Sequence, residues 1–230
     1  MTDRNNRIDF SAVLASAVHD MKNSLLLLMQ SIENMGEYFP VGTKQGDQIA
    51  TVQYEASRLN TGLAQLLSLY RVKLDQLPLN IQEHFVEDIL DELFAANQNY
   101  ISHKNIKLTV EKPEDDMSWY LDADLINVML NDVLINAMRY GNNEILIHAN
   151  EKDDYFVITI EDDGPGYPDI MLKNNETNMR DFNISSGRTG LGLFFARMIA
   201  EAHINGDKKG SVHLANGGSL GGSVFTLKLP

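Results

Sequence analysis

Hydrophobic residues recur at alternating steps of four and three along the N-terminal part of the chain. The first run, between Phe10 and about Tyr38, comprises Leu14, Val18, Met21, Leu25, Leu28, Ile32 and Met35. After a break at Phe39-Pro40-Val41-Gly42, the second run comprises Ile49, Val52, Ala56, Leu59, Leu63, Leu66 and Tyr70. A heptad spacing places such side chains along one seam of a helix. The pattern therefore predicts two helices joined by a short turn, which form an antiparallel hairpin.

This hairpin is expected to need a partner. Two helices cannot bury both seams together with the additional leucines Leu26 and Leu27. A second copy of the hairpin would complete a four-helix bundle, so the chain is predicted to form a homodimer. The alternative is that the seams pack against the remainder of the same chain.

A proline and a change of pattern mark a domain boundary. The segment from Asp75 to Asn80 contains Leu77-Pro78, and proline disfavours helix at the preceding residue. The elements predicted after it are a helix at about 83–102, strands at 106–110 and near Trp119, a helix at about 123–139, strands at 144–149 and 155–161, a helix at about 190–203, and strands near 211–215 and 223–229. This alternation predicts an α+β fold with helices on one face of a mixed sheet. The two domains are expected over residues 1–76 and 77–230.

Composition excludes several classes of protein. The 230 residues carry 19 Lys+Arg against 32 Asp+Glu, and the formal net charge of −13 disfavours a nucleic-acid partner. There is no cysteine, and the histidines form no HExxH pair, so neither a zinc site of that kind nor a disulfide framework is expected. The longest apolar run, Leu25 to Met29, is too short to span a membrane, and the N-terminus lacks a signal-peptide core. We therefore expect no membrane insertion and a cytoplasmic location.

Four short motifs follow one another in the second domain. They are Asn136-Ala137-Met138-Arg139-Tyr140 on an apolar helix, Asp162-Asp163-Gly164-Pro165-Gly166 at the end of a strand, Thr189-Gly190-Leu191-Gly192-Leu193 at the start of a helix, and Gly221-Gly222-Ser223-Val224-Phe225 at the start of the last strand. Each motif alone has an ordinary interpretation, because glycine-rich sequences also suit tight turns. In this order, the set resembles the ATP-binding domain shared by histidine kinases, DNA gyrase, the Hsp90 chaperones and MutL. The resemblance covers nearly all of residues 80–230 and implies the GHKL (Bergerat) α/β sandwich fold.

The first two motifs suit a base and a metal ion. The amide oxygen of Asn136 could coordinate Mg²⁺, which prefers oxygen ligands, without adding charge beside a triphosphate. The resemblance implies that the Asp162 carboxylate accepts a hydrogen bond from the adenine amino group. Gly164 and Gly166 would let the backbone approach the base closely.

The third motif suits phosphate groups. Gly190 and Gly192, with Thr189 and Leu191, would present N–H groups and a favourable dipole at a helix N-terminus. The polar segment from about Ile170 to Arg188 is expected to be a mobile lid over the nucleotide.

At the end of the first motif, Arg139 offers the phosphates a cation and Tyr140 offers the nucleotide a ring face or hydroxyl. Without the motifs, a solvated surface charge for Arg139 and a core position for Tyr140 would be the better interpretations.

A further candidate is the sequence His19-Asp20-Met21-Lys22-Asn23 in the first helix. A lone histidine beside a heptad position is more often a packing or surface residue, but this sequence resembles the phosphoacceptor box of histidine kinases. His19 follows the seam residue Val18, so it is expected to face solvent as a nucleophile. Asp20 could hydrogen-bond the ring nitrogen that does not attack. By the resemblance, Asn23 could orient a water molecule that dephosphorylates the partner.

Two positions depart from the pattern of the family. Asp132 stands where most histidine kinases carry asparagine, and Arg188 stands where glycine is frequent. The Asp132 carboxylate could bind the metal ion, repel the phosphates, or activate water as a glutamate does there in the related ATPases. Arg188 could contact phosphate or simply tolerate the backbone of the turn.

The sequence as a whole predicts a histidine protein kinase that uses ATP and Mg²⁺. It would phosphorylate its own His19, transfer the group to an aspartate of a response regulator receiver domain, and reverse that modification as a phosphatase. Input is expected from a separate sensory protein acting in trans. The alternatives are a phosphotransfer or adaptor protein with weak or no kinase activity, and a GHKL-type ATPase that uses Asp132.

Overall fold

The computed structural model describes residues 10–36, 38–39, 43–73, 79–113, 116–173 and 191–230. For residues 10–16, 19, 64–73 and 191 it describes the backbone alone. The chain divides into two compact units, Met1–Leu77 and Pro78–Pro230.

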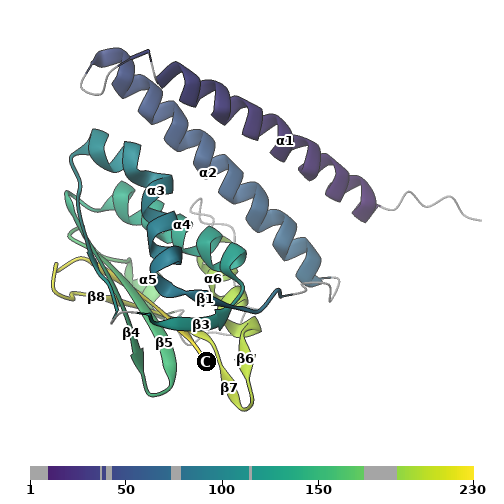
Figure 1. Cartoon of the computed structure of the whole chain (residues 1–230), viewed down its shortest axis with the longest axis vertical. Coiled ribbons are helices and arrows are strands. Elements are labelled where there is room, and N and C mark those ends of the chain that lie inside the picture. Colours follow the sequence, from purple (N-terminus) through teal and green to yellow (C-terminus); the bar gives the residue numbers. More distant parts are fainter. Residues whose placement is uncertain (1–9, 37, 40–42, 74–78, 114–115, 174–190) are drawn as a thin grey trace, which may run out of the picture. The chain divides into compact units, whose positions relative to one another are not determined.

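The first unit is a helical hairpin, as the heptad pattern predicts. Helix α1 (Phe10–Gly36) packs against helix α2 (Lys44–Lys73) along their length (Figure 1). Leu25, Ile32 and Ala56 are buried between them, and Met29, Ile49 and Leu63 pack partly against this core. The prediction of an N-terminal hairpin is confirmed.

Among the seam residues whose side chains are described, buried or partly buried positions alternate with exposed ones. On α1, Val18, Leu25 and Ile32 are buried, whereas Met21, Leu28 and Met35 are 46%, 51% and 51% exposed. On α2, Val52 and Leu59 are 52% and 59% exposed. Because the buried and exposed residues of α1 alternate along one heptad pattern, the hairpin carries a second apolar stripe that the other helix does not cover.

The second unit is built on a mixed sheet of five strands. Its strands are β2 (Lys107–Glu111), β4 (Glu144–Lys152), β5 (Tyr155–Asp162), β9 (Ser223–Leu229) and β8 (Ser211–Asn216), in that order across the sheet. Strand β2 runs parallel to β4, and the other neighbours are antiparallel. The α+β class and the mixed sheet are confirmed.

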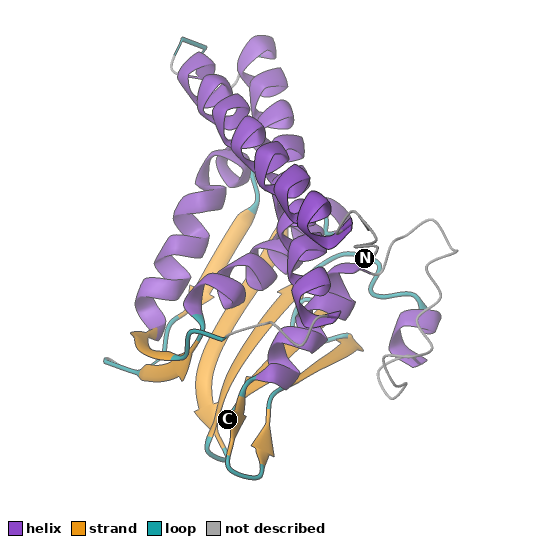
Figure 2. Ribbon diagram, turned by 90° about the vertical axis from the view of Figure 1, so that its right-hand side faces the viewer, coloured by secondary structure: helices purple, strands orange, loops and turns teal. Residues whose placement is uncertain are grey.

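The larger helices of this unit cover one face of the sheet (Figure 2). They are α3 (Val86–Lys104), α4 (Ala123–Tyr140) and α6 (Leu191–Ala202). Helices α4 and α6 contact the strands and each other, while α3 packs on α4. Ile126, Leu130 and Leu134, spaced by four along α4, are fully buried. Through this apolar stripe and its neighbours, α4 packs against the sheet and against α3 and α6.

The start of the second unit differs from the prediction. Residues 83–85, expected to be helical, belong to strand β1 (Gln82–Phe85), which pairs antiparallel with β3 (Ser118–Leu121). The helix begins at Val86, whose N–H donates to the Met117 carbonyl at 2.9 Å. The pairing partner lies far along the chain, so local periodicity does not reveal it.

Short elements were also missed. Strands β6 (Ile204–Asn205) and β7 (Lys208–Lys209) form a small hairpin whose turn includes Gly206 at φ +59°. Helix α5 (Asp169–Lys173) lies at the start of the expected lid, of which residues 174–188 are outside the described residues. Elements this short contain too few positions to show a hydrophobic period.

Within the described residues, no helix combines the length and the apolar character needed to cross a membrane.

Candidate functional site

The carboxylate of Asp162 is buried at the end of β5 and is held by backbone groups. Its Oδ1 accepts hydrogen bonds from the N–H of Gly164 at 2.8 Å and of Ser223 at 3.1 Å. The Gly222 N–H donates to the Asp162 carbonyl at 3.0 Å. The turn after β5 and the start of β9 thus orient this side chain, which is only 4% exposed. Its position is fixed by the fold before any ligand arrives.

Two glycines allow this close approach. A Cβ added at Gly222 would lie 2.4 Å from the Asp162 carbonyl oxygen, and one added at Gly164 would lie 2.4 Å from the Tyr140 carbonyl oxygen. Main-chain atoms cannot move aside as the end of a flexible side chain can. Glycine is therefore required at both positions, and the end of α4 lies directly beside the turn after β5.

The next residues of this turn are tied to β8. Gly166 has φ +83°, a conformation that favours glycine. Asn216 accepts a hydrogen bond from the Tyr167 N–H at 2.7 Å and donates from Nδ2 to the Tyr167 carbonyl at 2.9 Å. Burial, followed by the negative charge of Asp162, raises the pKa of the Tyr167 phenol, which therefore stays neutral. Sequence analysis missed Asn216 and Tyr167, since nothing local connects the two residues.

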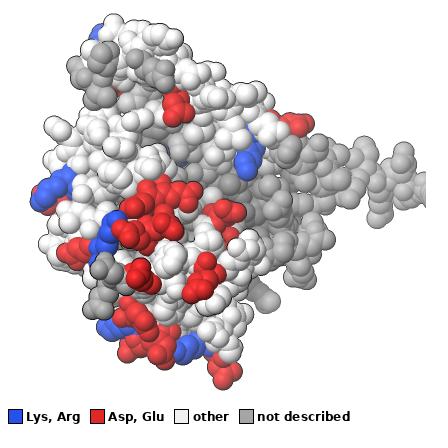
Figure 3. Space-filling model, in the orientation of Figure 1, with Lys and Arg blue, Asp and Glu red and all other residues white. Residues whose placement is uncertain are grey.

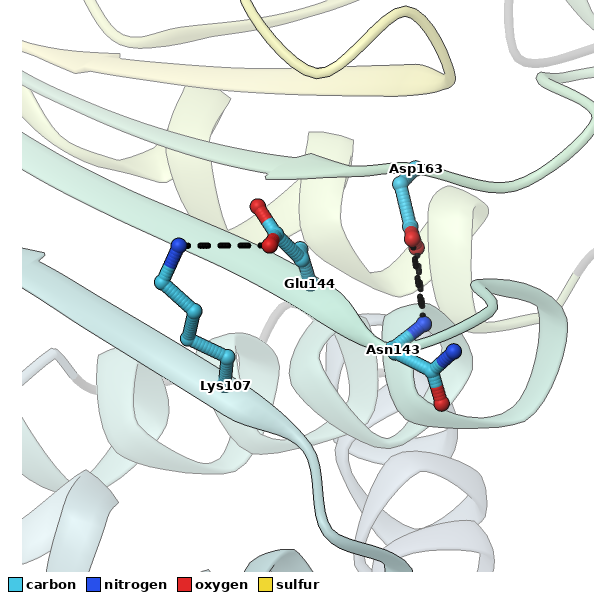
Figure 4. A network of polar contacts seen from close by, with 4 residues as sticks. All are labelled: Lys107, Asn143, Glu144 and Asp163. Atoms are coloured by element: carbon cyan, nitrogen blue, oxygen red, sulfur yellow. Dashed lines mark hydrogen bonds and ion pairs between the residues drawn. The ribbon is translucent and has the colours of Figure 1, made fainter.

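The second aspartate of the motif, Asp163, accepts backbone hydrogen bonds from a neighbouring turn (Figure 4). Asp163 Oδ1 accepts from the N–H of Asn142 at 2.8 Å and of Asn143 at 3.1 Å. Burial alone raises the pKa of Asp163, but the backbone donors of Asn143, Asn142 and Glu144 together lower it below its usual value. Beside this contact, Lys107 pairs with Glu144 at 3.2 Å. Asp163 thus holds the turn between α4 and β4, whereas Asp162 is the carboxylate at the core of the motif.

A second group of predicted residues meets where α4 contacts α6. Asp132 and Asn136 lie one turn apart on α4, with Asn136 Nδ2 3.4 Å from Asp132 Oδ2. A Cβ added at Gly192 would lie 2.0 Å from the same Asp132 oxygen. The structure therefore brings Asp132, Asn136 and Gly192 together, although Gly192 is distant in sequence.

The donor atoms of this group suit magnesium. A carboxylate and an amide supply the hard oxygen ligands that Mg²⁺ prefers, and Mg²⁺ is usually held by few protein groups together with substrate phosphates. Among the described residues there is no cluster of three or more His, Cys, Asp or Glu that could hold a metal ion. A carboxylate and an amide side chain are thus suited to share a metal ion with the phosphate groups of a ligand.

Arg139 and Tyr140 are exposed at the end of α4. The Arg139 guanidinium carbon lies 5.4 Å from the centre of the Tyr140 ring, within the range of a cation–π contact. Tyr140 is 46% exposed, so the alternative of a core aromatic is wrong.

Several predicted residues cannot be placed. Arg188, Thr189 and Gly190 lie outside the described residues, and Leu191 is described by its backbone alone. On α1, His19 is also described by its backbone alone, and it follows the buried Val18.

Its predicted companions Asp20 and Asn23 are described and are exposed. The Ser24 hydroxyl donates to the Asp20 main-chain carbonyl at 3.0 Å.

Acidic side chains gather on the face of the molecule shown in Figure 3. On α3, Glu87, Asp88, Asp91 and Glu92 are all exposed, and Lys112 pairs with Glu87 and Asp91. These side chains contribute to the formal net charge of −13, and a surface of this sign repels phosphate groups.

Comparison with known proteins identifies this architecture. Residues 121–230 match the family model "Histidine kinase-, DNA gyrase B-, and HSP90-like ATPase". The chain is 25% identical over 227 residues to the sensor protein SrrB of Staphylococcus aureus strain N315, and the match covers 94% of this chain. The same protein of strain NCTC 8325 matches at the same identity and coverage. The chain spans about 37% of the length of these curated relatives.

Solved structures show the same fold. The Acinetobacter baumannii histidine kinase AdeS matches with a TM-score of 0.58 at 20% identity, over 92% of this chain and 96% of that one. The catalytic domain of histidine kinase ThkA matches with a TM-score of 0.54 at 22% identity, over 66% of this chain and 95% of that one. Residues 121–230 therefore match the histidine kinase-, DNA gyrase B-, and HSP90-like ATPase family, and the chain has the fold of a histidine kinase catalytic core.

Proposed function

We propose that this chain is an ATP-dependent protein histidine kinase that phosphorylates His19 and passes the phosphoryl group to an aspartate of a response regulator. The observation that carries the proposal is the buried Asp162 carboxylate, which two backbone N–H groups orient within a domain of an ATPase family. A buried carboxylate held in this way is suited to recognise a hydrogen-bond donor on a ligand.

The residues around Asp162 are assigned to the nucleotide base. The Asp162 carboxylate would accept a hydrogen bond from the adenine amino group, and Gly164 and Gly166 would keep the backbone close to the ring. Tyr140 is exposed at the adjacent end of α4, where its ring or hydroxyl can meet the nucleotide.

The residues between α4 and α6 are assigned to the metal ion and the phosphates. Asn136 and Asp132 would hold Mg²⁺, which neutralises phosphate charge when bound. The N–H groups of Thr189, Gly190, Leu191 and Gly192 would bind phosphate oxygens, with Arg139 and Arg188 as cations.

The chemistry is the transfer of one phosphoryl group in two steps. In the first, a ring nitrogen of His19 bonds to the γ-phosphorus, the bond to the bridging oxygen breaks, and ADP leaves. In the second, an aspartate oxygen of the regulator bonds to phosphorus as the P–N bond breaks, and the imidazole is restored. Asp20 would hold the other ring nitrogen, and Asn23 would orient water in a phosphatase reaction.

The proposed partners are a second copy of the chain, a receiver domain and a sensory protein. The uncovered apolar stripe of the hairpin supports a homodimer through a four-helix bundle. A receiver domain would dock to present its aspartate, and a separate sensory protein would supply the input in trans. The proposed location is the cytoplasm, where ATP and these partners would be available.

The test is incubation with γ-labelled ATP and Mg²⁺. The wild-type chain should acquire acid-labile label, His19→Gln should acquire none, and His213→Gln, which changes an exposed histidine of β8, should match the wild type. Label that persists in His19→Gln would show that another group is the acceptor. A complete absence of label alongside tight nucleotide binding would instead favour a phosphotransfer or adaptor protein.

A second candidate function is ATP hydrolysis. It is favoured by the position of the Asp132 carboxylate beside Asn136, where an ATPase could use it to activate water. In that case phosphate would be released equally by the wild type and His19→Gln, and release would be lost in Asp132→Asn.

A further inference from the structure

Asp132 places a negative charge at the beginning of helix α6. Its Oδ2 would lie 2.0 Å from a Cβ at Gly192, the second residue of this 12-residue helix. The N-terminus of a helix attracts anions through its N–H groups and its dipole. In the proposed function, this is where the phosphates of a nucleotide bind, so carboxylate and phosphate would be close neighbours.

Two like charges this close oppose each other. Even at the dielectric constant of water, a pair of unit charges about 4 Å apart changes a binding constant by about fivefold, and partial burial increases the effect. Asp132 is half-buried, which reduces the screening of its charge by solvent. A nucleotide without a cation would therefore bind against the field of this carboxylate.

A divalent cation would reverse the effect of the same residue. The Asn136 amide nitrogen lies 3.4 Å from the Asp132 carboxylate, so a charged and a neutral side chain with oxygen atoms lie side by side on adjacent turns of α4. With a cation present, the negative charge of Asp132 attracts the cation and so stabilises binding of the metal–nucleotide complex. One side chain thus lowers the affinity for the metal-free nucleotide and raises it for the metal-bound form.

We infer that Asp132 is a specificity-determining residue that makes nucleotide binding conditional on a divalent cation; this rests on the proposed nucleotide site. An asparagine at position 132 would keep an oxygen beside Asn136 but would remove the charge. Binding of the metal-free nucleotide should then improve, while binding of the magnesium complex should weaken or stay the same.

The experiment measures ADP binding by titration calorimetry, once with excess MgCl₂ and once with excess EDTA. ADP is used because no phosphoryl transfer to His19 can occur from it. For Asp132→Asn, affinity for ADP in EDTA is expected to rise about fivefold over the wild type, from the loss of one like-charge pair. The ratio between the two affinities should fall by at least the same factor.

The matched control is Asp124→Asn. Asp124 is an exposed residue in the first turn of the same helix, so this variant removes the same charge away from the start of α6. Its two affinities should equal those of the wild type. Thermal unfolding of both variants checks that the fold is retained, and a purely structural role of Asp132 would weaken binding in both solutions alike.

The outcomes separate the two proposals. If Asp132→Asn binds ADP in EDTA no better than the wild type, the inference is overturned, although labelling of His19 could still support the kinase. An equal gain in Asp124→Asn would also overturn it, because net charge would then explain the effect. If the wild-type chain binds no ADP in either solution, the nucleotide site itself is wrong.

Discussion

Gly192 and Asp132 approach so closely that a Cβ on the glycine would lie 2.0 Å from the carboxylate Oδ2 of the aspartate. The start of α6 therefore rests on the side chain of Asp132 in α4. Because the atom in the way is the end of a side chain, a larger residue at position 192 can be accommodated only by moving that carboxylate.

The first prediction concerns Gly192→Ala. The added methyl should displace the Asp132 carboxylate, and with it the Asn136 contact, so affinity for ADP with Mg²⁺ should fall about tenfold. Stability should change little, because alanine is favoured over glycine in a helix by up to about 1 kcal/mol, which offsets the strain. Calorimetry and thermal unfolding measure the two effects.

The control for this variant is Gly62→Ala in α2, where an added Cβ would have no neighbour within 4 Å. It should raise the stability of the hairpin slightly and leave ADP binding unchanged. Undiminished ADP affinity in Gly192→Ala would show that the contact with Asp132 is not part of the site.

The second prediction separates the structural role of Asp162, which accepts backbone hydrogen bonds, from its proposed role in binding the base. In Asp162→Asn, the amide oxygen can still accept from the N–H groups of Gly164 and Ser223, so the unfolding free energy should change by less than about 1 kcal/mol. In Asp162→Ala, both buried donors lose their acceptor, at a cost of about 2 to 5 kcal/mol. Urea denaturation compares the two variants.

Nucleotide binding should respond differently from stability. Asp162→Asn removes the charged acceptor proposed for the adenine amino group, so ADP affinity should fall by roughly tenfold to a hundredfold. If this well-folded variant binds ADP as the wild type does, Asp162 does not recognise the base.

Much of this architecture could be predicted from local sequence. The heptad spacing of Val18, Leu25 and Ile32 indicates the hairpin, and the alternation of Ile145 and Ile147 indicates a half-buried strand. Asp162 was identified because the glycines after it form part of a recognisable motif. Such signals need only neighbouring residues, and the structure confirms the hairpin and the strand.

Features that depend on distant partners escaped prediction. Strand β1 is a strand because it pairs with β3, and its own four residues contain no clear period. Asn216 holds the turn at Tyr167 across the fold, and the contact of Asp132 with Gly192 depends on how α4 packs against α6. Register and packing are properties of the whole domain, so they cannot be derived from local patterns.

The third prediction concerns the buried His203, which joins the end of α6 to the start of α4. Its Nδ1 lies 2.8 Å from the Ile199 carbonyl, and its Nε2 accepts from the Asp122 N–H at 3.1 Å. The ring is therefore neutral, with its proton on Nδ1. Desolvation by burial is the main cause that lowers the pKa of His203 from 6.5.

A pKa that is lower in the folded state than in the unfolded state fixes the sign of the pH effect. The contribution of His203 to stability is fully present above its pKa in the unfolded state, about 6.5. It is lost as pH falls through the lower pKa of the folded state. The urea midpoint of the wild type should therefore decrease below about pH 6.5. Replacement of His203 by glutamine should flatten this decrease, whereas His213→Gln, at an exposed position, should preserve it.

The last prediction concerns the apolar stripe of the hairpin. Leu28 is 51% exposed in the single chain, yet it occupies a heptad position between the buried Leu25 and Ile32. If a second hairpin covers the stripe, each dimer buries the exposed half of this leucine twice, at about 0.8 to 1.5 kcal/mol for each copy. Leu28→Glu should therefore weaken the dimer by at least roughly 2 to 3 kcal/mol, which shifts the equilibrium toward monomers. Sedimentation velocity should show this shift, while Gln30→Glu, at an exposed polar position of the same helix, should remain dimeric. A Leu28→Glu chain that sediments as the wild type does would exclude this stripe as the contact between copies.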